Sequence, residues 1–276
     1  MLELYNHDMS VCAAKVRFAM AEKGLDYTSH MVNLLAREHK TPEYLALNPN
    51  GLVPTLVHDG HVVYESNIIN EYLEERFPEI SLMPGSALGK ARVRKWTQQL
   101  DTAIHAAASV VSTCIAFRDF FLSKSPEDLE LHFRSQPGAD PLKVARHNDN
   151  IQNGVKSKYF AHAVMRFDNL LTDMEKELSS GEPWLAGETF SLADIGYASY
   201  IRRLEHLQLS PMWDCRPHFA DWYARLQQRD AFRVAILDWD NQHYIANMAE
   251  KGTRDWPLVH EIITSGTASE VEDQLR

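Results

Sequence analysis

The spacing of hydrophobic positions changes near residue 80. Before that point, short apolar runs lie at residues 2–5, 28–34, 53–57 and 61–65, and turn residues bound each run. Runs that are brief, rich in β-branched and aromatic residues and separated by turns are typical of strands. Helical patterns alternate with them, so this half of the chain predicts the element order β-α-β-(α)-β-β-α.

Capping and turn residues predict where several of these elements begin and end. Ser10 precedes a helical pattern as an N-cap would, and Gly24 ends that pattern. The Asp-Gly pair at 59–60 predicts a tight hairpin turn between two antiparallel strands. Ser66 predicts the cap of a further helix that stops before Pro78.

The remaining residues have the pattern of helices. A proline and a glycine interrupt the periodicity at 79–88 and predict a linker. Long helices are predicted at 91–121 and 155–178. Between them, the polar and proline-broken segment 123–154 predicts an insertion into an otherwise compact helical bundle.

Composition narrows the possible classes of function. The 276 residues are 45% hydrophobic and 24% charged, which is ordinary for a globular protein, and three scattered cysteines favour neither a disulfide framework nor a cysteine zinc site. A net charge of -10 without a basic stripe argues against nucleic acid as a partner. His58 and His61 lack a further ligand, so no metal site is expected. Without an apolar signal-peptide core or a membrane-length apolar stretch, we expect a cytoplasmic protein with no membrane partner.

Several motifs, in order, carry a family resemblance: VPTL at 53–56, DG at 59–60, ESNII at 65–69 and SLAD at 191–194 within an all-helical half. This arrangement resembles the cytosolic glutathione transferases over nearly the whole chain. The resemblance implies an α+β thioredoxin-like glutathione-binding domain at residues 1–80. It also implies an all-α helical bundle at residues 90–260 that binds the second substrate.

The resemblance also implies a site for glutathione as co-substrate. It places a cis peptide at Val53-Pro54, with the Val53 backbone N–H and C=O pairing with the cysteinyl part of glutathione. Ser66, at a helix N-terminus, would hold the glutamyl carboxylate, and Glu65 would lie near the amine. Taken alone, Ser66 is better explained as a plain helix cap, and Val53-Pro54 in the matching place reverses that balance.

A third contact region is implied at His39 and Lys40, for the glycyl carboxylate of glutathione. For His39 alone, a solvated polar loop is the competing interpretation. Leu52 stands where many relatives carry glutamine. This departure removes one side-chain hydrogen bond but leaves the Val53 backbone pairing.

Chemistry at the thiol requires a lowered pKa, because a free thiol with a pKa of about 8.5 is mostly protonated near neutrality. A hydroxyl that donates to the sulfur and a helix N-terminus both stabilise the thiolate. The resemblance places the catalytic serine of serine-type transferases at Ser10. Cys12 is the competitor, through a mixed disulfide with glutathione, although counting back from Arg17 favours Ser10.

The insertion, the run at 59–79 and the long helical half resemble bacterial β-etherases, which cleave lignin-derived aryl ethers. We therefore expect thiolate attack on an electrophilic carbon of a hydrophobic aromatic substrate, giving a glutathione thioether and a phenol. The alternatives are general xenobiotic conjugation or dehalogenation, maleylacetoacetate isomerisation, and a non-catalytic binding or partner subunit. The family resemblance further implies a homodimer or a heterodimer with a related chain.

Overall fold

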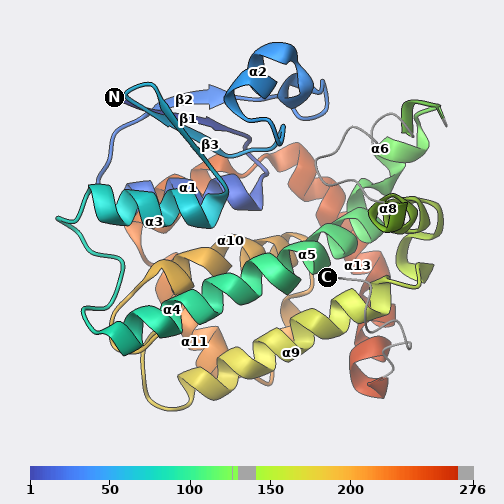
Figure 1. Ribbon diagram of the computed structural model, residues 1–276. Coiled ribbons are helices and arrows are strands. Elements are labelled where there is room, and N and C mark those ends of the chain that lie inside the picture. Colours follow the sequence, from blue (N-terminus) through green and yellow to red (C-terminus); the bar gives the residue numbers. More distant parts are fainter. Residues whose placement is uncertain (126, 130–140, 267–276) are drawn as a thin grey trace. The chain divides into compact units, whose positions relative to one another are not determined.

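A computed structural model (Figure 1) describes residues 1–125, 127–129 and 141–266. The chain divides into two compact units, each made of several segments. The first contains Met1–Thr97, Gly181–Tyr200 and Asp221–Asn241. The second contains Gln98–Ser180, Ile201–Ala220 and Gln242–Arg276.

The first unit is built on a four-stranded sheet in the order β2-β1-β3-β4. The strands are β1 (Leu2–Asn6), β2 (Thr28–Met31), β3 (Thr55–His58) and β4 (His61–Tyr64). The helices between and after them are α1 (Val11–Glu22), α2 (Pro42–Leu47) and α3 (Ser66–Arg76). Strand β1 pairs in parallel with β2 and antiparallel with β3, and β3 pairs antiparallel with β4. The predicted element order is confirmed.

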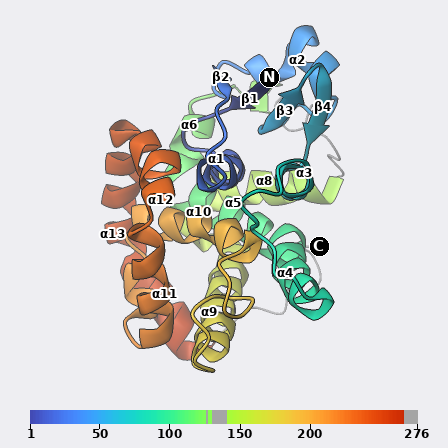
Figure 2. The same ribbon diagram turned by 90° about the vertical axis from the view of Figure 1, so that its left-hand side faces the viewer.

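One face of the sheet packs on α1 and α3 (Figures 1 and 2). Alternate residues of β1 point into this layer because successive side chains of a strand lie on opposite faces. The buried residues that form this core are Leu2, Leu4, Val16, Met20, Leu56, Ile69 and Leu73. The core holds the ends of the strands in place, and the candidate site lies at those ends.

Local geometry agrees with most of the predicted caps and turns. Ser10 is the N-cap of α1, and Gly24 adopts φ +63° just past its end. Asp59 and Gly60, at φ +50° and +83°, form the predicted hairpin turn. The prediction that Ser66 caps α3 was wrong. Ser66 is the first helical residue, and the N-cap is Glu65 at φ +71°.

The later segments of the first unit pack around a buried carboxylate. Asp194 lies in the first turn of α10 (Leu192–His206) and is fully buried. It accepts hydrogen bonds from the backbone N–H groups of Leu185 and Ser191, both at 3.0 Å, and from the Trp222 indole at 2.9 Å. Burial raises the pKa of this carboxyl. The helix α12 (Asp230–Ala235) lies in these segments, and α11 (Pro217–Gln227) begins in the second unit and enters the first at Asp221.

The predicted long helix at 91–121 is confirmed as a run from Ala87 to Leu122. It comprises α4 (Ala87–Gln99), α5 (His105–Ser112) and α6 (Arg118–Leu122), joined by π-helical turns at Leu100–Ile104 and Thr113–Phe117. Among the described residues, this helix alone is long and apolar enough to cross a membrane, but 61% of its apolar window is buried inside the protein. A core helix passes the same test.

Further helices of the second unit are α8 (Pro141–Asn153), α9 (Phe160–Leu178) and α13 (Gln242–Ser265). Of the predicted insertion, residues 130–140 lie outside the described residues. The second π turn is tied to α13, because the Ala116 carbonyl accepts hydrogen bonds from Asn247 at 3.2 Å and Lys251 at 3.1 Å. A π turn displaces carbonyls from the regular helical ladder, which lets side chains of another helix reach them.

Candidate functional site

Strand pairing gathers the predicted site residues at one edge of the sheet. Tyr5 is paired with Thr55, and Thr55 with Tyr64. The loop after β1, the residues before β3 and the residues after β4 therefore leave the sheet at the same edge. Ser10, Val53-Pro54 and Glu65–Ser66 lie in these three segments.

The Val53-Pro54 peptide bond is cis, as predicted. The carbonyl just before it belongs to Leu52 and accepts hydrogen bonds from the Tyr44 hydroxyl at 2.6 Å and from Asn48 at 2.9 Å. Burial raises the pKa of Tyr44 to about 12, so its hydroxyl remains a donor at neutral pH. Within the described part of the chain, no hydrogen bond engages the Val53 backbone. That backbone is available to pair with an extended ligand, while the Leu52 side chain is 44% exposed beside it.

Glu65 and Ser66 mark the start of α3. Ser66 is buried, and the first turn of α3 contains no acidic residue and receives no side-chain cap from Glu65. The N–H groups and positive dipole end of this helix can therefore bind a carboxylate. Glu65 Oε1 accepts a hydrogen bond from Asn50 at 3.2 Å, which holds the acid beside the helix start.

His39 and Lys40 lie in a short 3-10 helix, Glu38–Lys40. His39 is buried, so the interpretation of it as a solvated loop residue was wrong. The Lys40 ammonium donates to the Asn50 carbonyl at 3.4 Å. Burial, and then the nearby charge of Arg37, lower the pKa of Lys40.

Asn50 thus connects Lys40 with Glu65, a link that the sequence analysis missed. The close packing of this loop explains the glycine that follows. Gly51 has φ +54°, and a Cβ there would lie 2.7 Å from the His39 carbonyl oxygen.

Ser10 stands at the start of α1. Its Oγ accepts a hydrogen bond from the Ala13 N–H at 3.2 Å, so the hydroxyl can still donate its own proton. The first turn of α1 has no acidic residue to oppose an anion. Cys12 lies in the same turn and is half-buried, with its Sγ 3.6 Å from the Tyr200 hydroxyl.

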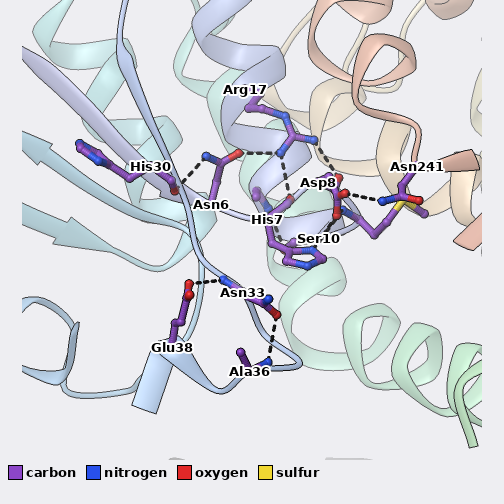
Figure 3. A network of polar contacts seen from close by, with 12 residues as sticks. Asn6, His7, Asp8, Ser10, Arg17, His30, Asn33, Ala36, Glu38 and Asn241 are labelled. Atoms are coloured by element: carbon purple, nitrogen blue, oxygen red, sulfur yellow. Dashed lines mark hydrogen bonds and ion pairs between the residues drawn. The ribbon is translucent and has the colours of Figure 1, made fainter. Parts of the chain in front are cut away.

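Arg17 is a site residue that the sequence analysis used only to locate Ser10. Its side chain points back toward the loop before α1. It is 1% exposed and donates to the carbonyls of His7 and Asp8, both at 3.2 Å (Figure 3). Its position two turns after Ser10 was the available signal.

The Asp8 carboxylate completes this loop. Its Oδ1 accepts the Met9 N–H at 2.6 Å and lies 3.0 Å from His7 Nδ1, while Oδ2 accepts from Asn241 at 2.9 Å (Figure 3). No sequence pattern could have identified Asn241, because it meets Asp8 only in the folded chain.

Two segments of the chain match models of a known protein family. Residues 9–76 match the family model "Glutathione S-transferase, N-terminal domain", and residues 157–225 match "Glutathione S-transferase, C-terminal domain". The tetrachloro-p-hydroquinone reductive dehalogenase of Sphingobium chlorophenolicum is 27% identical, over 85% of this chain and 95% of its own. Protein LigF of Sphingobium sp. is 29% identical, over 70% of this chain and 75% of its own.

Among solved structures, the β-etherase LigF from Sphingobium sp. strain SYK-6 superposes with a TM-score of 0.75 at 26% identity. This match covers 86% of the present chain and 99% of LigF. Both halves of the chain thus match glutathione transferases, in sequence and in fold. The chain belongs to the glutathione transferase superfamily.

Proposed function

We propose that this protein is a glutathione transferase that activates the glutathione thiol for attack on an electrophilic carbon. The main support for this proposal is one structural observation. The Ser10 hydroxyl, the Val53 backbone and the start of α3, which has no side-chain capping hydrogen bond, belong to segments that leave the sheet at the same edge.

Each part of the tripeptide has a chemically matched group there. The glutamyl carboxylate binds the N–H groups at Ser66, and its ammonium lies by the Glu65 carboxylate that Asn50 holds. The cysteinyl backbone pairs with Val53 as a short added strand would. Lys40, with His39 beside it, binds the glycyl carboxylate through charge-assisted hydrogen bonds.

Ser10 supports formation of the thiolate. Since Ala13 supplies one hydrogen bond to Ser10 Oγ, the serine proton is directed to the sulfur. A hydrogen bond to a charged group contributes about 1.5–3 kcal/mol, and the helix N-terminus adds about 0.3–1 kcal/mol. Together they lower the thiol pKa by one to two units, at about 1.4 kcal/mol each.

For the substrate we propose a β-aryl ether beside a ketone, in which the adjacent carbonyl activates the carbon that bears the phenoxy group. The sulfur–carbon bond forms as the carbon–oxygen bond breaks, and the electron pair leaves on a phenolate. Because a phenol has a pKa of about 10, its phenolate is a far better leaving group than an alkoxide. Water then protonates the phenolate. The similarity to the β-etherase LigF supports this substrate class.

The test is incubation with glutathione and a keto aryl ether dimer. We expect release of free phenol and an equal amount of glutathione thioether, with Ser10→Ala as the matched control of reduced activity. If neither product forms while a chloroarene is conjugated rapidly, the protein is a general detoxifying transferase. If calorimetry detects glutathione binding but no electrophile reacts, the non-catalytic binding subunit is the correct alternative.

Dehalogenation is a second candidate, supported by the similarity to the reductive dehalogenase and by Cys12 in the first turn of α1. Chloride release from a chlorinated hydroquinone in the presence of glutathione tests it. This activity should disappear in Cys12→Ala. Thioether formation that survives in Cys12→Ala argues for the etherase instead.

A further inference from the structure

The loop that carries Ser10 is held from its backbone side by a buried cation. The Arg17 guanidinium donates through Nη1 to the His7 carbonyl and through Nη2 to the Asp8 carbonyl, both at 3.2 Å. Its Nε donates to the Ala235 carbonyl at 3.0 Å, and the guanidinium carbon lies 4.1 Å from the centre of the Trp239 ring. One side chain therefore joins the loop to the segment 235–241, far along the chain.

A second tie runs from the same segment to the other side of the loop. Asn241 Nδ2 donates to Asp8 Oδ2 at 2.9 Å. Asp8 Oδ1 accepts the Met9 N–H at 2.6 Å and lies 3.0 Å from His7 Nδ1 (Figure 3). Both carboxylate oxygens are thus used in fixing the residues just before Ser10.

The hydrogen bonds from Arg17 and from Asn241 both help to fix the orientation of Ser10. The His7 carbonyl that Arg17 binds also accepts the Ser10 N–H at 3.2 Å. The φ and ψ of Ser10 are those of an extended N-cap, which aims Oγ at the Ala13 N–H. A shift of His7 or Asp8 moves the hydroxyl away from the sulfur that it stabilises.

The Arg17 charge acts in the same direction. Its four hydrogen bonds all go to oxygens of neutral groups, three backbone carbonyls and Asn6 Oδ1. Burial lowers the pKa of Arg17 to about 10, so the group is still a cation at neutral pH. This buried cation favours an anion at the start of α1, and the Asp8 carboxylate, whose charge also acts on Arg17, offsets part of that effect.

We propose that Arg17 and Asn241 are positioning residues for thiol activation: they tie the Ser10 loop to the segment 235–241 and set the acidity of bound glutathione. This inference rests on the proposed glutathione transferase function. It adds to that function a contribution from the segment 235–241, far from Ser10 in the sequence, without which the glutathione site is incomplete.

The decisive variant is Asn241→Asp, which keeps the shape of the side chain but places a carboxylate against that of Asp8. Its partner is the double variant Asp8→Asn with Asn241→Asp, in which the donor and the acceptor exchange places. The new amide oxygen of residue 8 can still accept the Met9 N–H. Arg233→Met is the matched control, since it removes an exposed ion pair with Asp238 within the same stretch of chain.

The readouts are the pH midpoint of thiolate absorbance for bound glutathione, kcat with a chloroarene, and KM for glutathione. In Asn241→Asp we expect the midpoint to rise by about one pH unit and kcat near neutral pH to fall about tenfold, with KM within about twofold. The double variant should recover most of both losses, and Arg233→Met should match the wild type. Arg17→Lys, which keeps the charge but loses the planar fork, should also raise the midpoint.

The wild-type protein tests the glutathione transferase function, and the variants test the positioning role. A wild-type protein without a bound-thiolate signal contradicts the proposed function itself. A normal wild-type signal that Asn241→Asp leaves unchanged overturns the positioning role alone. If Asn241→Asp lowers activity but the double variant does not recover it, the loss is structural and the inference fails.

Discussion

Ser10 and Cys12 lie two residues apart at the start of α1, and one substitution in each separates their roles. Ser10→Ala removes a hydroxyl whose oxygen accepts the Ala13 N–H at 3.2 Å and which, in the proposed site, donates its own proton to the glutathione sulfur. Loss of one hydrogen bond to a charged atom predicts a fall in kcat/KM of about 10- to 100-fold. Steady-state rates with glutathione and a chloroarene measure it.

Cys12→Ala is the matched comparison. Its Sγ lies 3.6 Å from the Tyr200 hydroxyl, and we expect the variant to retain most of the conjugating activity. The opposite pattern, with Cys12→Ala inactive and Ser10→Ala active, would assign catalysis to the cysteine.

What the sequence reveals about individual site residues depends on how local their contacts are. Val53-Pro54 and Glu65–Ser66 stand in short motifs at the ends of strands, so pattern and resemblance located them. Asn50 and Asn241 contribute through side-chain hydrogen bonds to residues that only folding brings near. The spacing between Ser10 and Arg17 could be read from the sequence. The direction of the Arg17 side chain could not, because it depends on the folded helix and on burial.

At the scale of elements, the end of α1 is joined to α3 by a buried ion pair. Lys23 Nζ lies 2.6 Å from Glu74 Oε2 and also donates to the carbonyls of Phe77 and Ile80. Burial works to raise the pKa of Glu74, but hydrogen bonds from Lys23, Ser81 and Leu82 outweigh it and leave the pKa below its usual value of 4.5.

This pair predicts a pH dependence of stability. Because the folded state lowers the pKa of Glu74, its contribution is present above the usual value of 4.5 and is lost as pH falls through the lower folded value. Glu74→Gln should be less stable by about 2 kcal/mol at pH 7, and the difference from wild type should shrink below pH 4.5. Urea unfolding at a series of pH values measures both. A constant difference would contradict the assignment.

The contact between α13 and the end of α10 predicts a second effect. At Gly252 in α13, a Cβ would lie 1.8 Å from the Leu207 carbonyl oxygen, a backbone atom that cannot easily move. Gly252→Ala should therefore destabilise the protein by about 3 kcal/mol or more, measured as a fall in the free energy of unfolding.

Gly85→Ala is the control, since nothing lies within 4 Å of a Cβ there. Equal stability of the two variants would show that α13 moves to accept the methyl group.

The sequence predicted the long helix of residues 87–122 but not its π turns. Contacts of the second π turn depend on a helix far along the chain, so no local pattern reveals them. The Ala116 carbonyl is held by Asn247 and Lys251 of α13. Likewise, nothing local in the sequence indicated that Glu65 would take a positive φ and that α3 would begin at Ser66.

Periodicity predicted the order of strands and helices along the whole chain. It did not predict which segments belong to each of the two units. Residues 181–200 and 221–241 belong to the unit that contains the sheet, although they follow the long helix in the chain. Hydrogen bonds such as that from Trp96 to the Leu185 carbonyl, at 2.8 Å, fix this membership. Such contacts depend on packing across long stretches of chain, which periodicity does not encode.

Exposed apolar side chains on β4 and α3 provide a test of the proposed dimer. Strand β4 ends the sheet and α3 follows it, and their exposed apolar side chains include Val62 (37% exposed), Tyr64 (39%) and Ile68 (59%). Exposed apolar side chains are costly to leave in water, and we expect a second copy of the chain to cover them. We expect sedimentation of the wild type at about twice 31.6 kDa, and Ile68→Glu to shift it to the monomer at micromolar concentration because a buried unpaired charge is unfavourable. Val234→Glu changes a similarly exposed residue (46%) on α12 and should leave the mass unchanged, so equal dissociation in both variants, or a monomeric wild type, would contradict a homodimer through α3.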